Sequence, residues 1–389
     1  MKILLANKFY YNRGGDCIYT INVESLLKNK GHEVAVFSMQ HPDNFDSPYS
    51  KYFPSETKFS PSPPNLLETI LRPFGSKEVR TKFSRLLDDF QPEIVHLNNI
   101  HSQLSPLIAE IAYNRGIKVM WTIHDLKLLC PRYDGLRNGK VLCELCFTDK
   151  KQALKNKCMK NSYLASFIAY KEAKKWSKEK LEKYTTTFIA PSQFMANKMI
   201  SGGFNPDKIS VLNNFIDLDK TKKTAYEKED YYCYVGRLSP EKGIYTLVKA
   251  AQQLPNKLVI VGSGELQDLP LHENIAYAGR QQWPKVKEIL EKARFSVIPS
   301  EWNENNPLSV IESLCLGTPV LGADIGGIPE LIEKNTNGKL FESGNIAALK
   351  DKIKDMYQQS FDYSAIAKQA QSAYSSEKYY MDLMKIYNK

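Results

Sequence analysis

The residues best suited to chemistry lie between positions 300 and 312, where carboxylate, amide and proline side chains follow an apolar stretch. Asn306 is a favoured helix N-cap and Pro307 a favoured first helical residue, so we expect a helix from there to about 317. The first-turn N–H groups of Leu308, Ser309 and Val310 would then be available to bind a diphosphate.

Two carboxylates flank this expected helix start. Glu304 lies in the loop before the helix, and Glu312 lies about one and a half turns into it. An ionised carboxylate only accepts hydrogen bonds, which suits it to the hydroxyl groups of a sugar. The local chemistry therefore predicts a bound phosphate with sugar hydroxyls beside it.

Two cations are expected near the same ligand. The stretch 234–243 reads YVGRLSPEKG and places Arg237 and Lys242 in a loop directly after an apolar strand. Fixed cations of this kind stabilise the charge that develops on a departing diphosphate without the help of a metal ion.

The first half of the chain has polar residues after its own strands. Gly14 and Gly15 follow the first strand, where a backbone without side chains can approach a ligand closely. Asp16 comes next. His124 and Asp125 end another strand. His124 can donate a hydrogen bond to a sugar hydroxyl or be a packed structural histidine, and Asp125 can orient His124 or cap the following loop.

Short apolar strands that alternate with amphipathic helices must position these residues, which predicts parallel α/β architecture. The expected strands are 2–6, 33–38, 94–97, 118–124 and 188–192, then 231–237, 257–262, 275–279, 295–300 and 318–323. The pattern predicts two Rossmann-like domains that face each other across a cleft, with ligands at the carboxyl ends of the strands. We expect an N-terminal domain at 1–205 and a C-terminal domain at 206–369, with a helix at about 370–389 packing back on the first domain.

The motifs together resemble the glycosyltransferases of family 4, or glycosyl transferases group 1. The resemblance rests on the spacing of Glu304 and Glu312, on the GTPV and GGIPE segments that follow at 317–320 and 326–330, and on the loop with Arg237 and Lys242. Phe215 departs from the family pattern, which usually has Gly there, and this concerns only a local turn.

The resemblance implies a GT-B fold and transfer of a sugar from a UDP- or GDP-sugar, with retention of configuration and without a metal cofactor. It implies front-face substitution, in which the leaving phosphate takes the acceptor proton. Glu304 would hold the transferred sugar and Glu312 the ribose. The catalytic residues would be His124, Glu304, Arg237 and Lys242; the donor site would add Gly14, Gly15, Asn306, Leu308, Ser309 and Glu312; and the acceptor site would contain Asp16, His124 and Asp125.

Composition places the chain among globular proteins. Of its 389 residues, 42% are hydrophobic, and no apolar run reaches the ~18 residues that span a bilayer. With no signal-peptide pattern at the start, we expect a cytoplasmic protein with reduced cysteines. One loop-like stretch contains four cysteines, Cys130, Cys143, Cys146 and Cys158, and the spacing of Cys143 and Cys146 is that of a zinc knuckle. The sequence is compatible with a structural zinc site and equally with four free thiols.

Residues 149–185 hold eleven lysines against four acidic residues, a local +7 within a total of +10. The same segment contains Tyr163, Phe167, Tyr170 and Trp176, a mixture typical of helices that rest on anionic lipid. This favours peripheral membrane contact and a lipid-linked saccharide acceptor, as in the assembly of O-antigen, capsule or exopolysaccharide. In the alternative, the aromatics pack into the core and the acceptor is soluble.

Other classes fit less well. A dinucleotide-dependent oxidoreductase is excluded because the glycines at 262 and 264 lack a third at the required place. Nucleic-acid binding is not expected, because the basic segment contains no Arg. A catalytically silent subunit that binds nucleotide sugars stays open.

Overall fold

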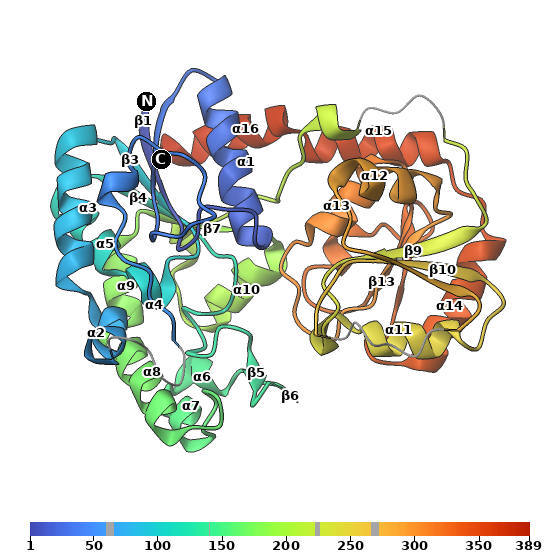
Figure 1. Ribbon diagram of the computed structural model, residues 1–389, viewed down its shortest axis with the longest axis horizontal. Coiled ribbons are helices and arrows are strands. Elements are labelled where there is room, and N and C mark those ends of the chain that lie inside the picture. Colours follow the sequence, from blue (N-terminus) through green and yellow to red (C-terminus); the bar gives the residue numbers. More distant parts are fainter. Residues whose placement is uncertain (60–65, 140, 222–225, 266–271) are drawn as a thin grey trace. The chain divides into compact units, whose positions relative to one another are not determined.

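The computed structural model describes residues 1–59, 66–139, 141–221, 226–265 and 272–389. The chain divides into two compact units (Figure 1). Unit 1 comprises Met1–Leu212 together with Asp382–Lys389, and unit 2 comprises Asn213–Met381. Each unit is built on a six-stranded parallel sheet, so the expected pair of Rossmann-like domains is confirmed.

The sheet of unit 1 has the order β2-β1-β3-β4-β7-β8. Its strands are β1 (Lys2–Ala6), β2 (Glu33–Phe37), β3 (Ile94–Leu97), β4 (Lys118–Thr122), β7 (Thr187–Ala190) and β8 (Ile209–Val211). The first five lie where the sequence predicted them. The sequence did not reveal β8, a three-residue edge strand that pairs with β7.

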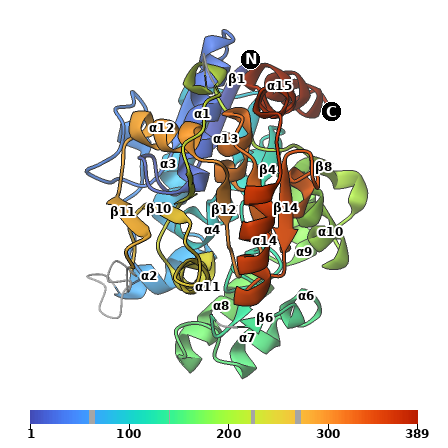
Figure 2. The same cartoon turned by 90° about the vertical axis from the view of Figure 1, so that its right-hand side faces the viewer.

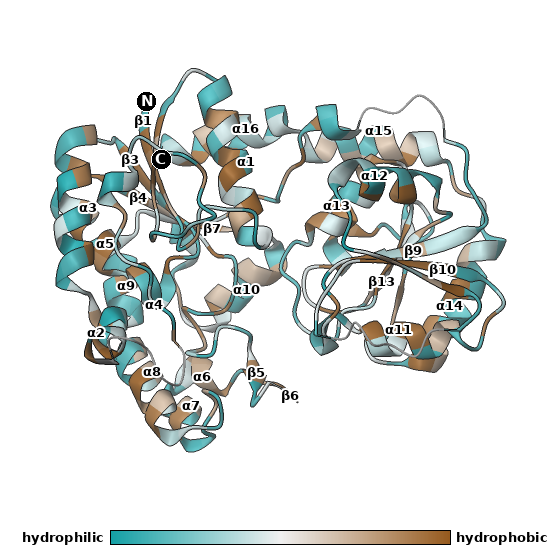
Figure 3. Ribbon diagram, in the orientation of Figure 1, coloured by the Kyte–Doolittle hydropathy of each residue, from teal (hydrophilic) through white to brown (hydrophobic). Residues whose placement is uncertain are grey.

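Successive side chains of these strands point to opposite faces of the sheet and pack into two separate layers. Leu4, Val95 and Trp121 join the large core beneath α3 (Lys77–Phe90) and α5 (Leu107–Asn114). The opposite face carries His96 and Thr122, which are fully buried under α1 (Gly15–Asn29) and the end of the chain. Figure 3 shows the hydrophobic colour of the strands between more polar helices.

The stretch between β4 and β7 forms a small lobe of short elements rather than a structureless loop. A two-stranded hairpin is followed by four helices in unit 1 (Figure 1). These elements are β5 (Leu136–Arg137), β6 (Val141–Leu142), α6 (Leu145–Thr148), α7 (Lys151–Lys155), α8 (Tyr163–Lys175) and α9 (Lys178–Tyr184). Unit 1 also contains α2 (Leu66–Leu71), α4 (His101–Leu104) and α10 (Gln193–Ser201).

The sheet of unit 2 has the order β11-β10-β9-β12-β13-β14, and Figure 2 labels β11, β10, β12 and β14 from one side of it to the other. Its strands are β9 (Tyr231–Val235), β10 (Lys257–Val261), β11 (Ile275–Gly279), β12 (Ser296–Ile298), β13 (Val320–Ala323) and β14 (Gly338–Phe341). Only β14 was not predicted. The helices are α11 (Ile244–Ala251), α12 (Trp283–Lys292), α13 (Leu308–Cys315), α14 (Ile346–Gln358), α15 (Tyr363–Tyr374) and α16 (Ser376–Tyr387).

The end of the chain belongs to both units. The expected single helical segment is two helices, α15 and α16, and it is only from Asp382 that the chain groups with unit 1. There the Tyr387 hydroxyl lies 2.6 Å from Nδ1 of His96, and Lys118 donates to the Tyr387 carbonyl oxygen at 3.2 Å. Unit 1 also runs past the expected boundary at 205, to Leu212, because β8 belongs to its sheet.

Candidate active site

Glu304 lies in the loop between β12 and α13, and the structure pairs it with Lys242. The Lys242 ammonium is 2.5 Å from Oε1 of Glu304, and the Ser300 hydroxyl donates to the same oxygen at 2.8 Å. Burial opposes ionisation of this carboxylate, yet Lys242 and the hydrogen bonds hold the pKa of Glu304 below its usual range. The two residues that the sequence placed in separate motifs therefore form one charged pair within unit 2.

Two glycines allow the loops around this pair to touch through their backbones. Gly243 has φ of 70°, and a Cβ there would lie 1.7 Å from the carbonyl oxygen of Pro299. Gly326 has φ of 63°, and a Cβ would lie 2.3 Å from the carbonyl oxygen of Glu304, which also accepts from the N–H of Gly327 at 2.7 Å. The GGIPE segment thus supports the Glu304 loop through direct backbone contact, and Lys242 is held against it by the turn at Gly243.

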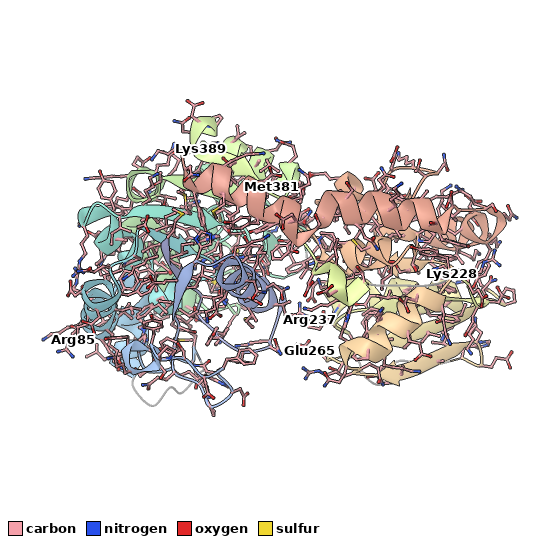
Figure 4. The ribbon with its side chains drawn as sticks, turned by 90° about the horizontal axis from the view of Figure 1, so that it is seen from above. Arg85, Lys228, Arg237, Glu265, Met381 and Lys389 are labelled. Atoms are coloured by element: carbon pink, nitrogen blue, oxygen red, sulfur yellow. The ribbon has the colours of Figure 1, made fainter. Side chains whose placement is uncertain are left out.

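Arg237 lies on the exposed loop after β9, where Figure 4 labels it. Its guanidinium is 2.6 Å from Oε1 of Glu241, and the Ser239 hydroxyl donates to that same oxygen at 2.7 Å. Glu241 was not predicted as a site residue, although it stands four residues after Arg237, the spacing of helical ion pairs. A diphosphate that bound Arg237 would compete with this carboxylate.

The start of α13 differs from the prediction. The helix begins at Leu308, Pro307 is its N-cap, and no side chain caps it, so the assignment of Asn306 as N-cap was wrong. Asn306 is buried instead and holds Asn214: its Oδ1 accepts from the Asn214 backbone N–H at 2.8 Å. The Val310 N–H donates to the Pro307 carbonyl oxygen at 3.1 Å, so Leu308 and Ser309 supply the first-turn amides that precede the hydrogen bonds of the helix.

Glu312 lies on α13, partly exposed. Burial raises the pKa of its carboxyl to about 7, and the positive charge of Lys220 only partly offsets this effect. Glu312 and Glu304 are therefore two carboxylates in different charge states: Glu304 is ionised throughout the neutral range, and Glu312 titrates within it.

In unit 1, Gly14 and Gly15 open α1 directly after the β1 loop. Gly14 is the N-cap, with an extended backbone, and Gly15 is exposed, so that a Cβ added there would meet nothing within 4 Å. The neighbouring Asp16 has one oxygen, Oδ2, that is buried and has no hydrogen-bond partner among the described residues. The first turn of α1 thus combines backbone N–H groups with one unpartnered carboxylate oxygen.

His124 lies after β4 with Nε2 3.0 Å from Oδ1 of Asn98 and its ring against the edge of Tyr19. Burial lowers the pKa of His124 to about 4 despite the nearby Asp16 and Asp125 carboxylates. The ring is therefore neutral at physiological pH and acts through hydrogen bonds rather than charge.

Asp125 does not orient His124. It contacts Nε2 of His101 at 2.9 Å and accepts from the Lys127 N–H at 2.9 Å, so it caps the following loop, the second of the two predicted roles. His101 was not predicted from the sequence. The signal was present, because His101 follows β3 as His124 follows β4, and adjacent parallel strands end at the same edge of a sheet.

Three of the four clustered cysteines, Cys130, Cys146 and Cys158, are buried, and Cys143 is partly exposed. A hydrogen bond from the Cys146 thiol lowers the pKa of Cys130, and the pKa of the donating Cys146 is raised. Within the described ranges, no three His, Cys, Asp or Glu side chains are grouped so as to hold a metal ion. The zinc site stays a prediction from cysteine spacing.

Two Rossmann-like domains, each a doubly wound parallel sheet, define the GT-B class of glycosyltransferase. Solved structures with this fold include Anabaena Alr3699/HepE in complex with UDP-glucose, with a TM-score of 0.66, 16% identity and coverage of 99% of both chains. The lipopolysaccharide outer core galactosyltransferase WaaB has a TM-score of 0.65, 17% identity and the same coverage of both chains.

The chain belongs to Glycosyltransferase Family 4, whose profile matches residues 14–220, and residues 215–373 match Glycosyl transferases group 1. It is 26% identical to an uncharacterized 42.6 kDa protein in the cps region of Klebsiella pneumoniae, over 85% of this chain and 87% of the relative. It is 27% identical to the amylovoran biosynthesis glycosyltransferase AmsK of Erwinia amylovora, over 41% and 44% of the two chains. It is also 27% identical to the lipopolysaccharide 1,6-galactosyltransferase of Escherichia coli, over 41% and 49%. The protein is a glycosyltransferase of the group 1 type.

No helix in the described part of the chain is long and apolar enough to cross a membrane.

Proposed function

We propose that this glycosyltransferase moves a sugar from a UDP- or GDP-sugar to a lipid-linked saccharide, with retention of configuration and without a metal cofactor. The observation that carries the proposal is the Lys242–Glu304 pair beside the open first turn of α13. It combines a cation for a phosphate with a carboxylate for sugar hydroxyls. The complex of Alr3699/HepE with UDP-glucose supports a UDP-sugar as donor.

In the proposed reaction, the bond between the anomeric carbon and the phosphate oxygen breaks with its electron pair on the phosphate. The acceptor hydroxyl oxygen bonds to the anomeric carbon on the same face, and its proton passes to the departing phosphate oxygen. Lys242, Arg237 and the amides of Leu308 and Ser309 stabilise the diphosphate charge that develops. Glu304 orients the sugar, and no covalent step on the protein is needed.

Glu312 is proposed to accept hydrogen bonds from the two ribose hydroxyls. The ionised carboxylate only accepts hydrogen bonds, whereas the protonated form also donates one. Burial raises the pKa of this carboxyl to about 7. Donor affinity should therefore increase as the pH rises through this value.

Unit 1 is proposed to bind the acceptor. His124 is neutral and partly exposed, and because its Nε2 donates to Oδ1 of Asn98, its Nδ1 can accept one hydrogen bond in a fixed direction. Asp16 offers a carboxylate oxygen without a partner among the described residues. Both groups suit acceptor hydroxyls.

The outer face of α8 supports contact with a membrane. Tyr163, Leu164 and Phe167 are 61%, 65% and 39% exposed, and the next turns of that face carry exposed lysines at 171, 174 and 175. Trp176 does not belong to this face, because it is buried with its indole N–H bonded to the Pro73 carbonyl oxygen at 2.8 Å. An apolar stripe with lysines beside it fits the interface of an anionic bilayer.

The donor proposal is tested by thermal unfolding with UDP, GDP and their sugars, in the presence and absence of EDTA. A nucleotide at about 100 times its dissociation constant should stabilise the protein by about 2.7 kcal/mol. Arg237→Ala should weaken the shift, whereas Lys285→Ala, which removes a similarly exposed cation paired with Glu288, should not. No shift with any nucleotide, or a shift abolished by EDTA, would contradict the proposal. NMR of the product anomer tests retention, and a donor shift without any turnover would favour a silent binding subunit.

The membrane proposal is tested by sedimentation with phosphatidylglycerol and phosphatidylcholine vesicles. Binding should require the anionic lipid and be lost in Leu164→Glu/Phe167→Glu. Ile200→Glu is the control, because Ile200 is 41% exposed on α10 of the same unit. Equal sedimentation of all three proteins, or none with either lipid, would favour a soluble acceptor.

A further inference from the structure

Unit 1 contains a cavity of about 290 Å³ between the loop after β4, helices α8 and α9, and the segment that follows α10. Two tryptophans form part of its wall, and we call it the tryptophan cavity. The Trp121 indole N–H donates to the Asn98 carbonyl oxygen at 3.1 Å, and the Trp176 indole N–H donates to the Pro73 carbonyl oxygen. Both rings are therefore fixed, and Phe147 and Phe204 complete an aromatic lining. The exposed side chains of Thr148 and Glu179 mark its opening to the surface.

The charged groups of the cavity neutralise one another. Glu172 is buried, with one oxygen 2.8 Å from the Lys127 ammonium and the other accepting from the Ser102 hydroxyl at 2.7 Å. The cavity lining contains three lysines and two glutamates, and Asp125, which holds His101 from outside the lining, adds a third carboxylate nearby. A ligand that fits this surface carries no net charge.

One polar atom of the lining residues has no protein partner. Nδ1 of His101 is buried without a hydrogen bond among the described residues, whereas Nε2 is held by Asp125 at 2.9 Å. A buried polar atom without a partner is uncommon in proteins, and a bound molecule is one way to satisfy it. Asp125 holds Nε2, so Nδ1 is the ring atom left for a ligand, and a hydroxyl group can pair with it because a hydroxyl both donates and accepts hydrogen bonds.

We propose that the tryptophan cavity binds one uncharged, hydroxyl-bearing ring, a sugar residue of the acceptor, with Nδ1 of His101 hydrogen-bonded to one of its hydroxyls. Fixed aromatic walls with a few polar groups are the usual composition of a small-molecule site, and the volume is at the lower end for such sites, which suits a single ring. The assignment to the acceptor rests on the proposed function. It is supported by the position of Asp125, which links His101 to the loop that carries His124.

Saturation-transfer-difference NMR tests the proposal with methyl α-glucopyranoside, methyl α-galactopyranoside and charged glucuronate as probes. The ring protons of at least one neutral glycoside should receive saturation in a concentration-dependent manner. Thr148→Trp should block the opening and abolish the signal. Thr81→Trp is the matched control, because Thr81 is an exposed residue of α3 in the same unit that does not line the cavity. His101→Leu should weaken binding by about three- to tenfold.

Ala173→Phe, which fills the cavity from α8, provides a second test if a variant at 148 or 101 does not fold. Glycoside binding that survives both Thr148→Trp and Ala173→Phe would overturn the proposal, as would no binding of either neutral glycoside or stronger binding of glucuronate. The UDP melting shift, measured on the same samples, separates the two proposals. A normal UDP shift without glycoside binding rejects the tryptophan cavity alone. If Thr148→Trp abolishes glycoside binding and no UDP shift is seen, the result supports the sugar site in the tryptophan cavity and rejects the proposed function.

Discussion

Replacing Lys242 by Met tests whether the charged pair is the centre of the donor site. The Glu304 side chain is 11% exposed and that of Lys242 is 23% exposed. Breaking a fully buried ion pair costs about 3–5 kcal/mol, and an exposed pair contributes about 0–1 kcal/mol. With exposures between these limits, we expect Lys242→Met to lower the free energy of unfolding by about 2–3 kcal/mol at pH 8.

The pH dependence of this loss follows from the two pKa values of Glu304. In the wild type the folded-state pKa lies below the unfolded one, so ionisation stabilises the protein above the unfolded pKa, and this stability is lost as the pH falls through the folded value. In Lys242→Met, burial without the lysine raises the folded-state pKa, so ionisation destabilises the variant as the pH rises. The difference in stability between the two proteins should therefore be largest at pH 8 and smallest near pH 4.

Urea unfolding followed by tryptophan fluorescence measures the effect, because the Lys242 ammonium is 5.2 Å from the centroid of the Trp302 ring. Transfer activity should fall by about 10²–10³-fold, the usual loss for one group that stabilises transition-state charge. Adding Glu304→Gln should restore most of the stability without restoring activity. Lys285→Met, at an exposed pair, should change stability by less than about 0.5 kcal/mol. A stability difference that does not vary with pH, or a double variant no more stable than Lys242→Met, would refute the reasoning.

Three further predictions concern other parts of the structure. Gly326→Ala should lower the free energy of unfolding by at least about 2–3 kcal/mol, because its φ is positive and a Cβ would collide with the Glu304 backbone. Gly279→Ala, at φ of 69° in open space, should lower it by only about 1–2 kcal/mol. Equal losses of the two variants in thermal melts would show that the contact with Glu304 is unimportant. Isothermal titration with UDP-glucose, whose phosphates do not titrate near neutral pH, should show affinity that falls below pH 7 in the wild type and is flat in Glu312→Gln, since burial raises the pKa of Glu312 to about 7. Parallel profiles would exclude Glu312 as the titrating group. His96→Leu should cost about 2–3 kcal/mol in urea unfolding at pH 7, because the Thr122 and Tyr387 hydroxyls lose their shared partner. Burial lowers the folded-state pKa of His96 to about 3, so wild-type stability gains from this residue as the pH rises toward about 6.5, and the variant should lack that slope.

The strands that carry the motifs could be predicted because each is a short apolar run followed at once by polar or glycine residues. Lys2–Ala6 and Tyr231–Val235 are examples whose bounds the sequence placed well. The edge strand Gly338–Phe341 could not be predicted from an apolar run, because it begins with glycine and has only two apolar residues. Its pairing with Val320–Ala323 is a tertiary property.

The site was predicted unevenly for a similar reason. The sequence shows where a carboxylate or a cation stands, but not which residue it contacts in the folded protein. The sequence therefore identified Lys242 and Glu304 but not their contact. It missed Glu241 and His101, although Glu241 stands four residues after Arg237 and His101 follows β3 as His124 follows β4. Asn306 was misassigned because a strong N-cap residue found a tertiary partner in Asn214 instead.

The chain end at Asp382–Lys389 sets the order in which the protein can fold during synthesis. The ribosome releases residues 1–212 before Asp382–Lys389, yet fully buried His96 needs the hydroxyl of Tyr387 as a partner. Unit 2 is contiguous and can fold as soon as it has emerged, so the unit that is translated first is completed last. A nascent chain that has not yet reached Asp382–Lys389 leaves the buried His96 without one of its two hydroxyl partners.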